Sequence, residues 1–468
     1  MSEIPNTAND GTQKTVGGNV AARGSTYALT LLLIVYICNF VDRNILSIVA
    51  QPMKEELKLA DWQVGLLGGL AFALFYVTAG LPIARLAERR NRVKIISVLL
   101  VIWSVMTAVC GLAQNFLQML LARIGVGAGE AGCSPASHSL IADYFPRGQR
   151  TTALAIYSMG IPAGPLIAGL VGGWAAQEYG WRAAFFVVGL PGLFLSVIVW
   201  LTLPEPPRGR YDPAPPADSK IPSFIDVLVH LYRKPTFLHI AAGSTLATFA
   251  NYSISTFAVP YLLRGYSLNI AQAGTAYGLL TGISAVAGTA LGGWLVDRYG
   301  ATDKRYYVLI PAAGVIVSGP LYILVLMQTN LALMALTVIV PAVVHYLYLG
   351  PTYGMTANMV DARMRATASA IVLFTLNLFG LGLGPLVTGI FSDYFASRAF
   401  AAGDFLAACP GGRAPADAAA SLAGACQSAS FEGLRTALII ASLFYVWSGI
   451  HYLWAVRSAR TDLAASEA

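Results

Sequence analysis

The sequence has few charged residues, and this scarcity excludes most soluble proteins. Only 11% of the 468 residues are Asp, Glu, Lys or Arg, whereas 56% are hydrophobic and the mean hydropathy is +0.63. A protein that folds in water covers its surface with many more charges, so this composition indicates a chain dissolved in lipid. None of the polar gaps is long enough for a soluble domain.

Motifs for nucleotide or metal chemistry are absent too. The chain contains neither the Gly-x4-Gly-Lys-Ser/Thr loop that binds nucleotide phosphates nor a His-Glu-x-x-His zinc motif. No pair of nucleophile and base stands out, so we expect no enzyme, no metal and no cofactor, and a proton gradient as the energy source. The pI of about 9.1 reflects basic loops beside the anionic inner leaflet, and no nucleic-acid partner is expected.

Long apolar runs, in contrast, recur along almost the whole chain. A helix needs roughly 20 residues to cross a bilayer. The polar segment before the first run lacks the features of a signal peptide, so that run is expected to be retained. We predict an all-α membrane protein with twelve transmembrane helices, at about residues 27–50, 62–86, 94–114, 116–142, 151–177, 182–203, 236–262, 271–296, 306–327, 331–358, 366–395 and 433–455.

Basic residues predict the orientation, because short loops rich in Lys and Arg stay in the cytoplasm. Alternate loops, together with both termini, hold about 21 of the 30 basic residues, and the opposite loops hold about seven. We therefore expect a multi-pass protein of the cell inner membrane with both termini in the cytoplasm. The two remaining basic residues, Arg43 and Arg123, lie inside predicted helices.

The two halves of the chain resemble each other. GPLIAG at 164–169 returns as GPLVTG at 384–389, and RTTALAI at 150–156 returns as RATASAI at 365–371. Many transporters combine two copies of one bundle in this way. A proline-rich linker joins the halves, with a short surface helix predicted at 222–232. The predicted parts are a cytoplasmic tail, a six-helix bundle, the linker, a second six-helix bundle and a second cytoplasmic tail, at 1–26, 27–203, 204–234, 235–457 and 458–468.

The motifs of the chain resemble those of the major facilitator superfamily over essentially its whole length. They are the loop GWLVDRYG at 293–300, the run RIGVG at 123–127, the Gly-Pro pairs of the fifth and eleventh helices, and the six-plus-six repeat. NFVDR at 39–43 and RIGVGAGEA at 123–131 are further similar to the Spinster group of lysolipid and sphingolipid transporters. The resemblance implies two six-helix bundles related by pseudo-two-fold symmetry, and transport by alternating access.

Four charged residues interrupt the predicted helices: Asp42, Arg43, Arg123 and Glu130. Each charge near the bilayer centre costs about 2.5–3.5 kcal/mol, so four unpaired charges would cost on the order of 10 kcal/mol. They are therefore expected to face one another or water. Arg123 and Glu130 share one helix face. The estimated depths favour a contact between Asp42 and Arg123, which would leave Arg43 and Glu130 free to face the cavity.

Two interpretations of this cluster are open. A salt-bridge knot could fix the first helix against the fourth, although buried ion pairs are rarely net stabilising. Intramembrane ionisable groups more often mark a substrate or proton path, and the family resemblance implies that these positions line the central cavity. We expect Asp42 and Glu130 to exchange protons, and Arg43, Arg123 and Glu130 to bind substrate. Polar residues of the second half are further candidates for the pocket: Asn251, His345, Tyr346 and Asn377.

Other residues are expected to form the gates. The Gly164–Pro165 pair can kink its helix or let it slide. Small residues at 160–173 and 278–293 could open a seam toward the lipid, so a bulky residue at Gly288 is expected to slow substrate access. Charges at the cytoplasmic helix ends are interpreted as a latch on the inner gate: Glu88, Arg89, Asp143, Arg150, Asp297, Arg298, Asp361 and Arg365.

Two of the five cysteines, Cys409 and Cys426, share the one long outward loop at about 397–432. A loop in the oxidising periplasm can hold a disulfide, so we predict a bond between them. The other three cysteines lie within predicted spans and are expected to be reduced.

The expected substrate is an amphiphile with one acyl or sphingoid chain and an anionic or zwitterionic head group, such as a lysophospholipid or sphingosine phosphate. Guanidinium groups suit a phosphate because they offer paired donors and stay charged when desolvated. We expect a proton-coupled secondary transporter that acts as a monomer in the bilayer. A proton-coupled exporter of small organic anions or drugs, and a lipid scramblase or facilitator without gradient coupling, are the alternatives.

Overall fold

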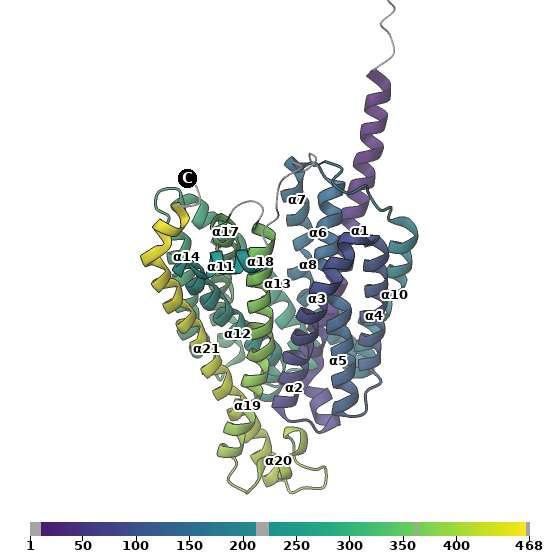
Figure 1. Cartoon of the computed structure of the whole chain (residues 1–468). Coiled ribbons are helices and arrows are strands. Elements are labelled where there is room, and N and C mark those ends of the chain that lie inside the picture. The colour runs from purple at the N-terminus through teal and green to yellow at the C-terminus, as the bar shows by residue number, and fades with distance from the viewer. Residues whose placement is uncertain (1–10, 212–223, 361–363, 465–468) are drawn as a thin grey trace, which may run out of the picture.

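The structure, a computed structural model, describes residues 11–211, 224–360 and 364–464, and the regular elements of these segments are helices. Ten helices in this part are long and apolar enough to cross a membrane by length and composition. Figure 1 shows them running side by side in two bundles, with the purple and blue first half beside the green and yellow second half. The predicted all-α membrane fold is confirmed.

The first bundle contains broken as well as continuous helices. The second span bends at Gly69, between α2 and α3, and the fifth contains a π-helical turn, η1, beside the GPLIAG motif. The elements in chain order are α1 Gly11–Leu57, α2 Asp61–Gly68, α3 Leu70–Arg89, α4 Arg92–Cys110, α5 Phe116–Glu130, α6 Cys133–Tyr144, α7 Arg147–Ser158, α8 Gly160–Ile167, η1 Ala168–Gly172, α9 Gly173–Tyr179 and α10 Trp181–Thr202.

The second bundle begins after the linker, where α11 (Phe224–Tyr232) confirms the short helix predicted there. Its eleventh span again carries a π-helical turn, η3, next to GPLVTG. The following elements are α12 Pro235–Gly265, α13 Ile270–Gly300, α14 Tyr306–Leu326, α15 Leu331–Thr337, α16 Ile339–Val344, η2 His345–Tyr348, α17 Leu349–Asn358, α18 Arg365–Thr375, η3 Leu376–Leu381, α19 Gly382–Ala399, α20 Phe405–Ala408, η4 Pro410–Gly412 and α21 Ala420–Ala464.

Two predicted spans fall outside the group of ten long apolar helices. The fourth is broken after Glu130 into α5 and α6, so neither piece is long enough by itself. The seventh is the continuous helix α12, in which hydroxyl and amide side chains lower the mean hydropathy. The first and last helices are longer than predicted, because α1 begins at Gly11 and α21 at Ala420, outside the apolar runs.

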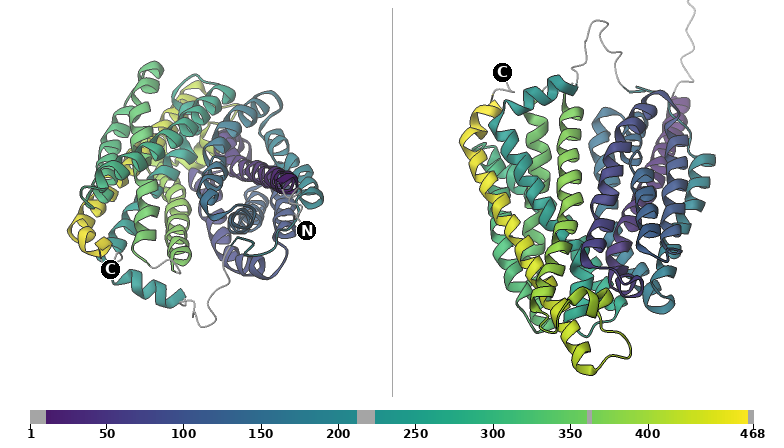
Figure 2. Two further views of the ribbon diagram at one scale, coloured as in Figure 1. Left: turned by 90° about the horizontal axis from the view of Figure 1, so that it is seen from above. Right: turned by 60° about the horizontal axis from the view of Figure 1, so that its bottom comes forward.

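The two bundles approach each other at one end and diverge at the other, where both described chain ends lie (Figures 1 and 2). Following the charge-based orientation, we call the diverging end the cytoplasmic end and the other the outer end. At the outer end α2 packs against α19, and α8, η1 and α9 pack against α13. Glycines allow this approach: a Cβ at Gly65 would lie 2.2 Å from the Pro385 carbonyl oxygen, and one at Gly169 would lie 2.2 Å from that of Gly274.

The small residues of the fifth and eighth spans form part of this seam. A Cβ at Gly278 would lie 2.7 Å from the Pro165 carbonyl oxygen, and one at Gly282 would lie 2.9 Å from that of Pro162. Gly288 is placed differently, because a Cβ there would lie 2.1 Å from the Val343 carbonyl oxygen within the second bundle. A bulky residue at Gly288 would therefore disrupt packing inside one bundle, and our choice of it as a probe of the seam was wrong.

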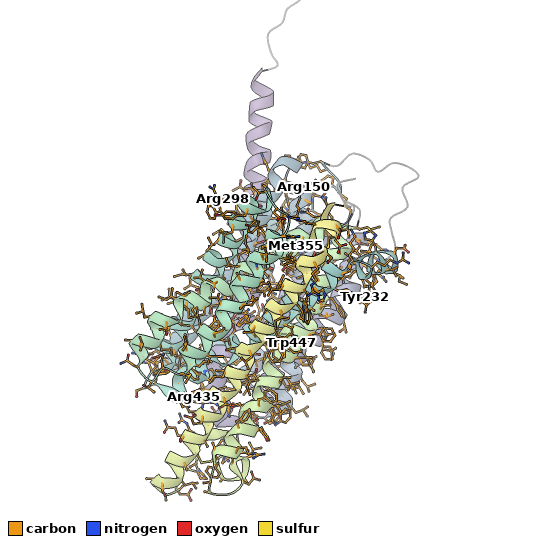
Figure 3. All side chains as sticks on the ribbon, turned by 90° about the vertical axis from the view of Figure 1, so that its left-hand side faces the viewer. Arg150, Tyr232, Arg298, Met355, Arg435 and Trp447 are labelled. Atoms are coloured by element: carbon orange, nitrogen blue, oxygen red, sulfur yellow. A yellow bond between two sulfur atoms is a disulfide. The ribbon has the colours of Figure 1, made fainter. Side chains whose placement is uncertain are left out.

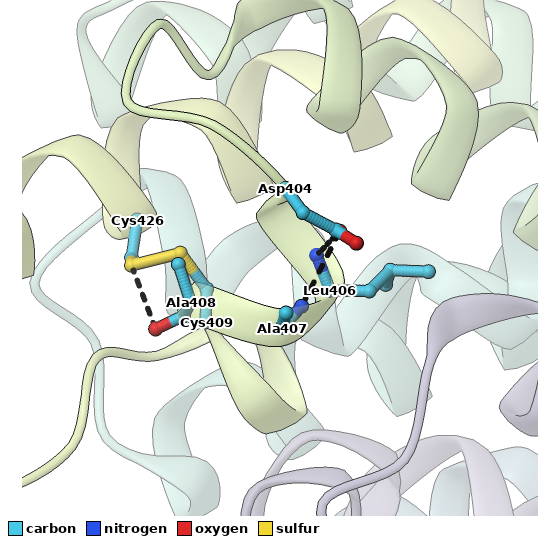
Figure 4. The surroundings of a disulfide bond; sticks show 6 residues. All are labelled: Asp404, Leu406, Ala407, Ala408, Cys409 and Cys426. Atoms are coloured by element: carbon cyan, nitrogen blue, oxygen red, sulfur yellow. Dashed lines mark hydrogen bonds between the residues drawn. A yellow bond between two sulfur atoms is a disulfide. The ribbon is translucent and has the colours of Figure 1, made fainter.

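The outer loop of the second bundle is held against the first. A disulfide joins Cys409 to Cys426, with the Cα atoms 5.7 Å apart (Figure 4). The disulfide begins directly before η4. This short helix packs closely on the end of α1, since a Cβ at Gly411 would lie 3.0 Å from the Lys54 carbonyl oxygen. Arg413 also pairs with Glu55 of α1 at 2.8 Å. The disulfide loop therefore covers part of the seam between the bundles.

Trypsin gives a direct test of this loop, because the exposed Arg413 lies between the two cysteines. Cleavage after Arg413 in unreduced protein is expected to leave the two fragments joined, and a reductant should then separate them on a denaturing gel. In the double variant Cys409→Ser and Cys426→Ser, cleavage should be faster and the fragments should separate without reductant. Two free thiols in mass spectra of alkylated, unreduced protein would contradict the disulfide.

Candidate functional site

The intramembrane charges gather inside the first bundle, where α1 and α5 bring them together. Arg43 donates to one carboxylate oxygen of Glu130, from Nη2 at 2.8 Å and from Nε at 3.3 Å. The Glu130 side chain is fully enclosed, whereas the Arg43 side chain is 10% exposed. Asp42 and Arg123 are also buried. Arg43 is therefore the member of the cluster that an incoming molecule can reach.

Aromatic rings surround the Arg43 guanidinium. Its central carbon lies 4.9 Å from the ring centre of Phe40, 4.7 Å from that of Phe72 and 5.0 Å from that of Tyr76. Phe72 and Tyr76 stack on each other with centroids 5.5 Å apart. Such rings stabilise a desolvated cation through its attraction to the π faces. We call Phe40, Phe72 and Tyr76 the aromatic cage of Arg43.

The expected pairing within the cluster is only partly right. Arg43 and Glu130 are not free, because they pair with each other. Asp42 and Arg123 interact electrostatically, yet the part of the chain that the structure describes holds no hydrogen bond or ion pair between them. Neighbouring residues on a helix point about 100° apart, so Asp42 faces a different group of side chains from Arg43.

Asp42 is enclosed with other polar groups that lack partners. It lies beside Trp103 and Thr107 of α4, and Arg123 donates weakly to the Leu67 carbonyl at 3.4 Å. Within the described residues, Asp42 Oδ1, the Trp103 indole N–H, the Thr107 hydroxyl and Arg123 Nη1 have no hydrogen-bond partner. Unpaired buried polar atoms are unfavourable, so this part of the cluster is suited to a change of protonation or of water content.

The candidates from the second bundle occupy different places. His345 is buried and its Nδ1 lies 3.2 Å from the Tyr322 hydroxyl of α14, so the two side chains connect neighbouring helices of the second bundle. The ring of Tyr346 packs on His345 with centroids 4.0 Å apart. Asn377 donates to the Leu373 carbonyl of its own helix, and Asn251 lies half-buried on α12. None of these four contacts the Arg43–Glu130 pair directly in the described structure.

A different residue of the second bundle bonds across to α1. The Tyr277 hydroxyl donates to Asn44 Oδ1 at 3.3 Å, one residue beyond Arg43. Tyr252 of α12 lies within electrostatic range of Arg43. These tyrosines bring the second bundle close to the charged cluster, and neither was among the residues predicted for the pocket.

The bonds that members of the predicted cytoplasmic latch make in the described residues lie within their own bundles. Asp143 pairs with Arg92 at 2.5 Å, within the first bundle, and Arg150 donates to the Phe145 carbonyl. Arg365 donates to the Ala357 carbonyl of its own bundle. Asp361 lies outside the described residues. The remaining members are exposed at helix ends of the cytoplasmic side, where Figure 3 labels Arg150 and Arg298: Glu88, Arg89, Asp297 and Arg298.

Ion pairs between the bundles are present at the outer end. Asp61, at the start of α2, accepts from Arg264 of the second bundle at 2.6 and 2.8 Å and from Lys54 at 2.6 Å. Ser392 donates to the same carboxylate at 2.6 Å. Asp393 accepts from the backbone N–H groups of Asp61 and Trp62 at 3.0 and 2.8 Å. We call Lys54, Asp61, Arg264 and Asp393, all buried, the outer latch.

The Gly164–Pro165 pair lies between α1 and the seam. A Cβ at Gly164 would lie 2.2 Å from Phe40 Cβ, and the Pro165 carbonyl faces Gly278 of α13. A movement of α8 would therefore change the packing both at the aromatic cage and at the contact between the bundles. This placement fits the expected gating role without testing it.

The sequence carries partial patterns for the aromatic cage and for the outer latch. Phe72 and Tyr76 are four residues apart, so they share a helix face, and in the structure that face meets Arg43. Lys54 and Arg264 lie in the last turns of the first and seventh helices, which are equivalent in the repeat, and Glu55 and Glu56 follow Lys54. The described residues contain no group of three or more His, Cys, Asp or Glu that could hold a metal ion.

Comparisons with known proteins give one family. Residues 32–385 match the model of the Major Facilitator Superfamily. An MFS-type efflux pump of Mycolicibacterium smegmatis is 33% identical over 366 residues, which are 78% of this chain and 84% of the relative. Protein spinster homolog 1 of Mus musculus is 27% identical over 421 residues, which are 84% of this chain and 76% of the relative. The crystal structure of a bacterial homologue of the human lysosomal transporter Spinster, inward-facing and unoccupied, superposes with a TM-score of 0.87 at 34% identity and covers 94% of this chain and 98% of that one.

Proposed function

The chain belongs to the Major Facilitator Superfamily and is a Spinster-type transporter that works by alternating access. From this premise we propose that it carries an amphiphile with an anionic or zwitterionic head group and that protons drive the transport. The substrate class is a lysophospholipid or a sphingosine-phosphate type lipid. The proposal places the protein in the cell inner membrane as a monomer, with both termini in the cytoplasm, a proton gradient as energy source and no cofactor.

The observation that carries the proposal is the caged Arg43. A guanidinium that is paired with a carboxylate and surrounded by aromatic rings can take a phosphate or carboxylate in place of its partner. The aromatic rings next to it suit the first part of an apolar chain. The divergence of the bundles at the cytoplasmic end supports access to Arg43 from that side (Figure 1).

Proton coupling follows from the competition for Arg43. The Glu130 carboxylate and a substrate anion need the same N–H donors, because Nε and Nη2 both donate to Glu130 Oε2. A proton on Glu130 removes its charge and weakens its hold on Arg43, which leaves the guanidinium to the substrate. Substrate and proton then favour each other's binding. Asp42, beside Arg123, is the second candidate proton carrier.

A second function is favoured by a specific comparison. The relative from Mycolicibacterium smegmatis is an efflux pump, and a caged guanidinium also suits a small aromatic organic anion. Proteoliposomes with and without a pH gradient separate the candidates. Accumulation of a fluorescent lysophospholipid that needs the gradient supports the leading proposal, and accumulation of a fluorescent organic anion alone supports the efflux alternative. Equal redistribution of lipid without a gradient would indicate a scramblase and contradict both.

Substrate binding is expected to depend on Arg43. Arg43→Ala should weaken the binding of a fluorescent lysophospholipid in detergent by roughly 10- to 100-fold, since hydrogen bonds to charged groups contribute about 1.5–3 kcal/mol. Arg43→Lys keeps the charge and should recover part of the affinity. The matched control is Arg182→Ala, which removes an arginine that lies over a Trp181 ring at the outer end. Unchanged affinity in Arg43→Ala would contradict the head-group assignment.

A further inference from the structure

A second site lies on the second bundle, away from the charged cluster. A pocket of about 290 Å³ is formed between the start of α12 and the end of α21, and its lining residues are Pro235, His239, Trp454, Arg457 and Ser458. No residue of the first bundle lines it, so it is separate from the proposed substrate site. Figure 3 faces α21 in yellow, the helix that carries three of these residues, and labels Trp447 on it.

Arg457 is an available cation in this pocket. It is exposed, and in the described part of the chain its guanidinium has no ion pair or hydrogen bond. The acids nearby are engaged elsewhere: Asp462 accepts from the Thr236 backbone N–H at 3.0 Å, and Asp303 pairs with Arg460 at 2.5 Å. All five N–H groups of Arg457 can therefore bind an oxygen-rich anion.

Two histidines add polar groups beside Arg457. Nδ1 of His239 lies 3.2 Å from Nδ1 of His451, so one ring donates and the other accepts. Neither Nε2 has a hydrogen-bond partner among the described residues. Trp454 packs against both rings, at centroid distances of 5.6 and 5.2 Å. The pocket thus combines a free cation, imidazole nitrogens and a half-exposed indole.

The position of the pocket points to a lipid. Tryptophan is enriched where the hydrocarbon meets the head groups, and the cytoplasmic leaflet carries the anionic phospholipids. From the pocket, an exposed apolar stripe runs along α21 toward the bilayer centre, at a spacing of about one helical turn: Trp454, Ile450, Trp447 and Leu443. A head group in the pocket would place its acyl chains along this stripe.

We propose that this pocket binds the phosphate of an anionic phospholipid of the cytoplasmic leaflet, through Arg457 and the His239–His451 pair. The planar guanidinium can bind two phosphate oxygens at once, and an imidazole N–H can donate to a third. The bound lipid would bridge the start of α12 and the end of α21. It would be a structural lipid of the second bundle and not the transported molecule.

Native mass spectrometry of the full-length protein, titrated with palmitoyl-oleoyl phosphatidylglycerol, tests this site. The wild type is expected to retain one phosphatidylglycerol at least ten-fold more tightly than phosphatidylcholine. Arg457→Gln should weaken that binding about ten-fold. Arg435→Gln, near the outer end of α21, is the matched control and should bind like the wild type. Arg43→Ala should also keep the lipid, which separates this site from substrate binding.

Two further measurements keep the proposal open to refutation if a variant is unstable. In wild-type protein, phosphatidylglycerol with brominated acyl chains should quench tryptophan fluorescence more than brominated phosphatidylcholine does, and Trp454→Phe should remove that difference. Millimolar glycerol phosphate or inorganic phosphate should not displace the lipid. Equal binding by Arg457→Gln and the wild type, or displacement by soluble phosphate, would overturn the assignment to a membrane lipid.

Discussion

Glu130→Gln is expected to abolish accumulation driven by a pH gradient while leaving lysophospholipid bound more tightly than in the wild type. The neutral amide no longer competes as an anion for Arg43, whose Nη2 lies 2.8 Å from Glu130 Oε2. Substrate binding to the wild type should strengthen as the pH falls through the titration of Glu130, and binding to Glu130→Gln should not change over that range. Equilibrium binding of the lysophospholipid to the wild type and to Glu130→Gln should be measured from about pH 5 to 8, where protein stability tends to be greatest.

Asp42→Asn provides the matched comparison within the same cluster. This variant should also lose gradient-driven accumulation, but its substrate affinity should stay near the wild-type value, because the Asp42 side chain forms no hydrogen bond or ion pair with Arg43 in the described structure. Exchange of substrate across the membrane, which needs no net proton movement, should continue. A pH-sensitive dye inside the proteoliposomes reports proton flux directly. Full accumulation by Asp42→Asn would assign the proton role to Glu130 alone.

Asp61→Asn is expected to shift the transporter away from the state that is closed at the outer end. The substitution leaves Lys54 and Arg264 as buried cations without the carboxylate that pairs with both. Breaking a buried pair in this way costs about 3–5 kcal/mol, which corresponds to a change of roughly 100-fold or more in a conformational equilibrium. Transport should slow severely, because the cycle would lack a stable inward-facing state.

Spin labels at Gln114 and Thr329, on outer loops of opposite bundles, can measure this shift. Electron-electron distance measurements should give a longer distance in Asp61→Asn than in the parent protein. The matched control is Asp303→Asn, which breaks an exposed ion pair within the second bundle and should leave the distance unchanged. Lys54→Met added to Asp61→Asn removes one uncompensated cation and should partly restore the short distance. An unaltered distance in Asp61→Asn would show that the outer latch does not stabilise this state.

The sequence by itself determined the membrane fold and the identity of the charged cluster. Apolar runs long enough to cross a bilayer leave the backbone no stable alternative to helices, and the repeated motifs divide these helices into two bundles. Asp42, Arg43, Arg123 and Glu130 were recognisable because a charge within an apolar run is expensive wherever the helix packs. These conclusions depend on local composition and spacing, which the chain carries before it folds.

Only the tertiary structure decided which partners those residues have. The pairing of Arg43 with Glu130, and the lack of an ion pair between Asp42 and Arg123 in the described residues, depend on how α1 is rotated against α5, because a rotation of about 100° exchanges adjacent residues. The outer latch joins Asp61 to Arg264 across 203 positions of sequence, and the charges at the cytoplasmic helix ends predicted a closure at the opposite end just as well. Sequence spacing fixes faces within one helix, whereas contacts between helices depend on the packing of many side chains, and that packing closed the outer end of this transporter.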